Sequence, residues 1–105
     1  MKNTTLFFDS AVVYNTHVVV FVSPKHNSVF RAGFKTSDEK DKHLPRMVKV
    51  LAEMGITDII TDYGIYTSLQ EACTKNNINV VSTVISTKIR AIIGHEMFAY
   101  FKEHK

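Results

Sequence analysis

Hydrophobic residues in the first third of the chain follow the patterns of β-strands. The run 5–8 is short and apolar, and the run 16–23 is rich in β-branched and aromatic residues, which suit a pleated, half-buried surface. In the run 28–36, positions 30, 32 and 34 are Phe, Ala and Phe, a period of two that predicts one buried face. Pro24 cannot donate to a strand ladder and separates the last two runs. Residues 17–36 are therefore predicted to form an antiparallel hairpin.

Beyond residue 40 the apolar positions alternate between the helical period and short buried runs. Helical spacing occurs in 41–55, 68–76 and 86–105. The run 57–61 has the composition of a short buried strand, and the run 78–83 is interpreted as the next strand. The polar run 35–43 precedes the first helix and is interpreted as a surface loop. The predicted element order is β-β-β-α-β-α-β-α.

The ends of the first two predicted helices carry residues that favour such ends. Asp41 is a suitable N-cap for the first helix, Pro45 suits its first turn, and Gly55 suits the left-handed position after its last turn. Ser68 and Glu71 have capping-box spacing at the start of the second helix.

This order predicts an α/β fold made of a mixed five-stranded sheet and three helices. The opening hairpin is antiparallel, and the strand–helix–strand units require parallel pairing with right-handed crossovers. We expect one α/β domain over residues 1–105, because a chain of 105 residues divided in two leaves too little core in each half. In such sheets ligands bind beyond the carboxyl ends of the parallel strands. Asp62, Tyr63 and Gly64 lie at one such end, Ser82 and Thr83 lie at another, and Asp9 is expected at a third.

The segment 43–83 resembles the dinitrogenase iron–molybdenum cofactor-biosynthesis family. It contains His43 in a polar run, "LAEMG" at 51–55, "YGIY" at 63–66 and "INVV" at 78–81, in the family's order. The resemblance implies a small cytoplasmic domain with a ribonuclease-H-like sheet and a role in handling a metal cluster. The chain has no His-Phe-Gly after its first strand, which that family uses to bind a cluster, so the resemblance carries over no cluster ligand from that motif.

Composition limits the function classes further. Hydrophobic residues make up 45% of the chain and charged residues 22%, as in ordinary globular proteins. The formal net charge is +3 with scattered basic residues, so nucleic-acid binding is not favoured over a solvated basic surface. No apolar run reaches the roughly 18 residues that span a bilayer, and the first residues do not favour a signal peptide. We expect a cytoplasmic protein with no membrane partner.

The leading hypothesis is a small non-enzymatic binding or accessory domain with its ligand surface at the bend after the strand 57–61. Tyr63 and Tyr66 flank Gly64 and could stack on a ligand ring, or equally close the edge of the core. Backbone N–H groups at the start of the second helix could hold an anion. The predicted binding residues are His43, Asp62, Tyr63, Gly64, Tyr66 and Ser68.

An alternative hypothesis is a Mg²⁺-dependent nuclease, or a nucleic-acid-binding domain, that uses Asp9 and Asp62. Both carboxylates follow apolar runs, and clustered carboxylates are the ligands that Mg²⁺ prefers in such sites. A third acid is not evident. Asp62 could instead cap a turn before Gly64. The residues alone leave the cofactor unknown.

The histidines, the single cysteine and the aromatic residues of the last helix are given structural interpretations. No two of the five histidines have i, i+4 spacing, which gives no helical metal pair, and Cys73 is expected in the core. Phe98 and Tyr100 lie off the apolar stripe of the last helix, so that helix is predicted to form a homodimer interface. A plain interaction module that uses this helix is the third hypothesis.

Overall fold

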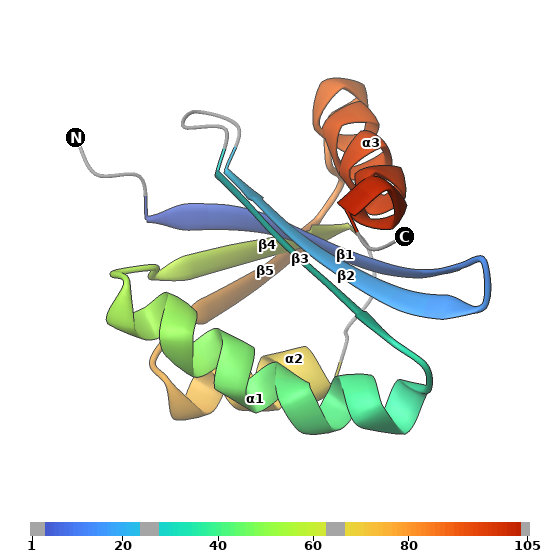
Figure 1. Cartoon of the computed structure of the whole chain (residues 1–105). Helices are drawn as coiled ribbons and strands as arrows, with labels where there is room; N and C mark the ends of the chain where they lie inside the picture. Colours follow the sequence, from blue (N-terminus) through green and yellow to red (C-terminus); the bar gives the residue numbers. More distant parts are fainter. Residues whose placement is uncertain (1–3, 24–27, 63–66, 104–105) are drawn as a thin grey trace.

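A five-stranded mixed sheet lies between helices on both of its faces (Figure 1). The computed structural model describes residues 4–23, 28–62 and 67–103. The strands are β1 (Thr5–Val13), β2 (Thr16–Ser23), β3 (Ser28–Phe34), β4 (Asp58–Asp62) and β5 (Asn79–Thr83), and the helices are α1 (Ser37–Glu53), α2 (Thr67–Lys75) and α3 (Thr87–Glu103). The strand order is β3-β2-β1-β4-β5; β1–β2 and β2–β3 are antiparallel, and β1–β4 and β4–β5 are parallel. The predicted element order and mixed sheet are confirmed.

Helices α1 and α2 cover one face of the sheet, here called the α1–α2 face, and α3 covers the other, the α3 face (Figure 1). Side chains alternate between the faces along each strand. Leu6 and Phe8 of β1 join the core under α1 and α2, whereas Phe7 and Ala11 pack against the core under α3. The sheet therefore separates two apolar cores.

Strand β1 is longer than the run 5–8 predicted. It continues to Val13 because residues 9–13 pair with β2, and a two-residue turn joins the strands. Tyr14 and Asn15 have φ values of 48° and 58°, the left-handed geometry of a hairpin turn whose twist matches the strands. Asp9 therefore lies within β1 and not after its end, which corrects the prediction.

The polar run 35–43 was predicted as a loop, and that prediction is wrong, because most of it forms the first turns of α1. The N-cap is Thr36, whose hydroxyl accepts a hydrogen bond from the backbone N–H of Glu39 at 3.1 Å. Asp41 and Pro45 consequently lie inside the helix and do not start it. Thr36 and Glu39 have the Thr-x-x-Glu spacing of a capping box, a signal that was present in the sequence.

The left-handed end predicted for α1 is confirmed. Gly55 has a φ of 94°, and the N–H of Ile56 donates to the carbonyl of Leu51 at 3.0 Å. Helix α2 ends in the same way, with Asn77 at φ 58°. The start of α2 differs from the prediction, because the helix begins at Thr67 and Ser68 lies in its first turn.

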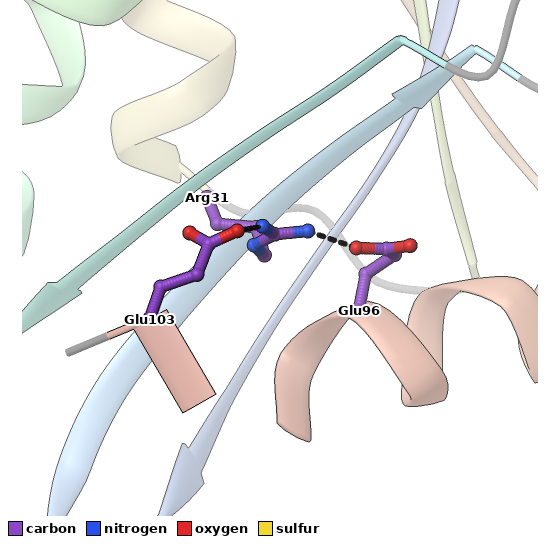
Figure 2. Close-up of polar contacts among 3 residues, drawn as sticks. All are labelled: Arg31, Glu96 and Glu103. Carbon is purple, nitrogen blue, oxygen red and sulfur yellow. Dashed lines mark hydrogen bonds and ion pairs between the residues drawn. The ribbon is translucent and has the colours of Figure 1, made fainter. Parts of the chain in front are cut away.

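An arginine of β3 and one close aromatic contact join α3 to the edge of the sheet, in addition to the apolar core beneath the helix. The guanidinium of Arg31 on β3 pairs with both Glu96 and Glu103 of α3 (Figure 2). The Tyr100 ring lies over Gly33, where a Cβ atom would stand 2.4 Å from Tyr100 Cζ. A glycine at this point therefore lets α3 approach β3 closely without displacing the Tyr100 ring.

Candidate functional site

Asp9 and Asp62 occupy neighbouring positions at the carboxyl edge of the parallel strands. The last residue pair between β1 and β4 is Phe8 with Thr61, and the two aspartates are the next residue on each strand. Since Phe8 faces α1 and α2, alternation turns Asp9 to the α3 face, and the same holds for Asp62 after the buried Thr61. The structure thus brings together the two carboxylates of the nuclease alternative.

Asp62 is bound to the chain that enters α3. Its Oδ2 lies 2.6 Å from Nη2 of Arg90, and its Oδ1 accepts a hydrogen bond from the N–H of Ile85 at 3.4 Å. Arg90 Nε in turn donates to the Ile85 carbonyl at 3.2 Å. The carboxylate therefore closes a ring of contacts that fixes the connection from β5 to α3.

The start of α3 completes this arrangement. Ser86 precedes the helix, and its hydroxyl accepts a hydrogen bond from the N–H of Ile89 at 3.3 Å, as an N-cap does. Asp62 was also predicted to cap a turn before Gly64, and that turn lies outside the residues that the structure describes. The contacts that are described give Asp62 a structural role in docking α3.

The pKa of Asp9 is raised above its ordinary value. The main cause is that the surrounding protein displaces water from the carboxylate, which disfavours its charged form. The backbone N–H of Ser10, at 2.8 Å, lowers the pKa. The negative charge of Asp62 raises it, and the positive charge of Arg90 lowers it. The two carboxylates are thus close enough to repel each other.

A metal site at this edge needs further ligands, and the guanidinium of Arg90 already neutralises one carboxylate. Among the described residues no group of three or more His, Cys, Asp and Glu side chains converges. Asp58, the other acid of β4, lies at the opposite end of the strand. Its carboxylate accepts hydrogen bonds from the side chains of Thr57 and Asn79. The geometry therefore favours a structural role for these charges, in which they hold α3 in place. It does not favour a complete catalytic centre built on the two carboxylates.

His43 does not join Asp62. It lies on α1 and not in a loop, its Nδ1 is 3.1 Å from the Glu39 carbonyl, and its ring centroid is 5.2 Å from that of Phe34. Because Asp62 faces α3, the sheet lies between the two side chains. One ligand surface that contains both is therefore not assembled.

The other predicted binding residues are distributed as follows. Ser68 is half-buried in the first turn of α2, a helix that packs on the same face of the sheet as α1. Tyr63, Gly64 and Tyr66 lie outside the described residues, so their predicted role stays a prediction. Cys73 is fully buried, as expected, and burial raises the pKa of its thiol to about 11, which makes it a poor nucleophile.

A cavity that the sequence did not predict lies between α1 and the edge of the sheet. This α1–β3 cavity has a volume of about 340 Å³. Its lining combines apolar side chains of β2, β3 and α1 with two arginines, and it includes Phe30, Arg31, Ala32, Arg46, Met47 and Val50. The sequence signal was the small Ala32 between two phenylalanines on one face of β3, which leaves space that α1 does not fill.

The two arginines of the cavity differ in their pairing. The guanidinium of Arg31 is engaged with Glu96 and Glu103 on the far face of the sheet (Figure 2). Arg46 is exposed on α1, and no ion pair or hydrogen bond joins its side chain to another described residue. The cavity therefore offers an apolar lining and one uncommitted positive charge.

Two further findings bear on identity and location. In comparisons with known proteins, neither a family model nor a curated protein sequence matches the chain. None of the helices in the described ranges is long and apolar enough to cross a membrane.

Proposed function

We propose that this chain is a small non-enzymatic binding domain whose ligand site is the α1–β3 cavity. The observation that carries the proposal is the cavity itself. Its volume of about 340 Å³ lies in the range of small-molecule sites, and its lining is mostly apolar, as in such sites. Phe30 and Val50 at its mouth are 37% and 45% exposed, which leaves a path from solvent.

The lining explains why binding and not catalysis is proposed for this cavity. Apolar side chains exclude water but transfer no proton, and an arginine guanidinium stays protonated at all physiological pH values. The cavity can therefore hold and orient a molecule without a general acid or base of its own. This is the chemistry of a carrier, sensor or accessory domain.

An accessory role is also what the resemblance of residues 43–83 to the cofactor-biosynthesis family suggests. A mixed sheet with three helices is compatible with the ribonuclease-H-like fold that the resemblance implies. We propose a cytoplasmic accessory protein on this basis. Purification without oxygen followed by elemental analysis and absorption spectroscopy tests the metal-cluster part of the role. If neither a bound metal nor metal uptake is found, that part is removed and the cavity remains.

We further propose a homodimer through α3. Phe98 is 54% exposed and meets Tyr14, which is 73% exposed, edge to face at 6.1 Å between ring centroids. These two rings form an apolar surface that a second copy could cover. Tyr100 is not available for this, because its ring packs over Gly33. Light scattering that shows a monomer at high micromolar concentration would overturn the dimer.

The binding proposal is tested with a neutral apolar probe and a variant that fills the cavity. Octan-1-ol is titrated into ¹⁵N-labelled protein, and we expect the amide signals of residues lining the cavity to shift. Ala32→Leu adds volume at the cavity wall and should abolish these shifts. Ala91→Leu, an equal change at an exposed position on α3, is the matched control and should leave binding unchanged.

Signals from the rest of the sheet must stay in place in Ala32→Leu, which shows that the variant is folded. Octanol shifts that are spread over the surface, or that survive the filled cavity, would contradict the proposal.

A second candidate is the Mg²⁺-dependent nuclease, which the adjacency of Asp9 and Asp62 favours. Its test compares Asp62→Asn with Asp58→Asn, a matched change at the opposite end of β4. A nuclease requires Mg²⁺-dependent cleavage of RNA or DNA that Asp62→Asn removes and Asp58→Asn retains. The binding-domain proposal predicts that the wild type, Asp62→Asn and Asp58→Asn all show the same background level of cleavage.

A further inference from the structure

We infer that the α1–β3 cavity takes an anionic amphiphile, a molecule with an apolar chain and one carboxylate, and that Arg46 binds the carboxylate. The inference rests on the proposed function and names the ligand class of the same cavity. It is carried by one juxtaposition: an arginine without a described partner lies at the mouth of an apolar cavity.

The position of Arg46 relative to the cavity follows from helical spacing. Val50 lies four residues after Arg46, so the two side chains are neighbours on one side of α1, and both line the cavity. Met47, also on the lining, is half-buried between this side and the core. The guanidinium therefore stands at the solvent end of the cavity, and the apolar wall extends inward from it.

The charges around Arg46 favour an anion. On a helix the nearest side chains are those three and four residues away. At these distances α1 places Lys42, His43, Lys49 and Val50 beside Arg46, and no acid. The acid nearest to Arg46 in the sequence, Asp41, is five residues away and lies on a different side of the helix, and Glu39 and Glu53 are each seven residues away, two turns along it. Arg46 is thus uncompensated by its own helix and lies between two lysines, which raises the local positive potential.

The rest of the lining excludes a ligand with several polar groups. Arg31, the second arginine, already binds two carboxylates of α3 on the far face of the sheet. The remaining lining side chains are apolar and can satisfy no hydrogen bond, so each buried polar group of a ligand would stay unpaired at a cost of about 1–3 kcal/mol. A single carboxylate outside and an aliphatic chain inside fit both parts of the cavity.

The test uses octanoate and octan-1-ol, which share the apolar chain and differ in the head group. Binding is followed by amide chemical shifts, so that affinity and location are measured together. We expect octanoate to bind at least tenfold more tightly than octan-1-ol, a difference that corresponds to about 1.4 kcal/mol. Arg46→Gln should remove this preference and leave octan-1-ol unaffected, and Arg46→Lys should restore part of it.

Lys49→Gln is the matched control, because it removes an equal charge one turn away without touching the lining. It should change octanoate affinity by less than about twofold, since an exposed charge that does not contact the carboxylate acts on it only weakly through solvent of high dielectric constant. Val50→Asp places a negative charge beside Arg46 at an exposed site and should weaken octanoate much more than octan-1-ol.

The outcomes separate the ligand class from the function. If both probes bind in the cavity with equal affinity, the anionic class is overturned and the binding function stands. If Lys49→Gln weakens octanoate as much as Arg46→Gln does, the assignment of the carboxylate to Arg46 is overturned. If neither probe binds there, both proposals fail. If added probe converts a dimer to a monomer in light scattering with Phe30 and Val50 shifted, a second copy covers the cavity and the amphiphile assignment is overturned.

Discussion

The two faces of the sheet hold their helices by different means. Among the residues that the structure describes, twelve buried ones form one continuous core on the α1–α2 face, whereas six do so on the α3 face. The α3 face adds directed charges: Arg31 pairs with two glutamates of α3, and Arg90 of α3 pairs with Asp62. Apolar burial is non-directional, while charged pairs fix distance and orientation. The larger core therefore supplies stability and tolerates an open cavity, and the smaller one depends on specific contacts to position α3.

The largest effect is expected from truncation of the larger core. Leu44 of α1 is fully buried in the larger core, and Leu44→Ala should lower the free energy of unfolding by about 3–4 kcal/mol through lost burial and a new cavity. Met97→Ala on the α3 face removes a flexible side chain that is 5% exposed and should cost about 2 kcal/mol. Urea denaturation of both variants measures the difference. Equal losses would mean that the two cores contribute alike.

The second effect concerns the arginine that joins β3 to α3. Arg31 and Glu96 are 17% and 18% exposed, so Arg31→Met leaves a half-buried carboxylate without its partner. Solvent reaches both groups, and we expect a loss of about 2 kcal/mol, below the value for a fully buried pair. Adding Glu96→Gln should recover part of the loss, because the stranded charge is then gone. A double variant that is as unstable as the sum of the single ones would show that the pair is not coupled.

Much of the fold could be predicted because the apolar positions keep a clear period or form short runs along most elements. The alternating positions of β3 and the short apolar runs of β4 and β5 each indicate a strand, although β3 and β5 are edge strands with no buried side chain among their described residues, and Gly55 marks the end of α1. The start of α1 was missed because its first turns are polar and mostly exposed. The spacing of hydrophobic residues therefore gives no helical signal there. Only the cap formed by Thr36 and Glu39 identifies that boundary.

The candidate sites were harder to predict because they depend on which strands are neighbours and on which face each residue lies. Asp9 and Asp62 are adjacent only because β4 pairs with β1, a fact of sheet order that spacing along the chain does not contain. His43 and Asp62 were grouped from a shared edge, but the sheet separates them. The cavity beside Ala32 is an unfilled volume, and a sequence shows which side chains are small but not where a helix leaves a gap.

A smaller effect is expected where α3 comes closest to the sheet. A Cβ at Gly33 would lie 2.4 Å from the Tyr100 ring, so Gly33→Ala forces the ring or the helix to move. Displacing one side chain end is cheaper than shifting backbone, and we expect a loss of about 1 kcal/mol. In a Tyr100→Ala background the obstacle is absent, and the same substitution should be neutral or slightly stabilising, because alanine restricts the unfolded chain. An unchanged cost in that background would place the obstacle elsewhere than in the aromatic contact.

The smallest effect is expected at Asp9, a carboxylate on the α3 face that has no salt bridge to another described residue. Asp9 has a pKa above its ordinary value of 3.8, so between 3.8 and the raised pKa the folded protein binds more protons than the unfolded chain. Stability should therefore fall as pH rises through this window and stay lower at neutral pH. Asp9→Asn removes the charge and should raise the urea midpoint at pH 7, with no difference from the wild type well below pH 3.8.

The stability of the wild type and of Asp9→Asn, measured with and without Mg²⁺, tests whether Asp9 belongs to a metal site. If the two carboxylates only hold α3, millimolar Mg²⁺ leaves the advantage of Asp9→Asn unchanged, because the cation acts on both proteins only through general screening. If they form a metal site, Mg²⁺ stabilises the folded wild type by mass action and not the variant, so the advantage shrinks or reverses. Ca²⁺ at the same ionic strength is the control for screening. Selective stabilisation of the wild type by Mg²⁺ would contradict a purely structural role for the two carboxylates and would support the nuclease candidate.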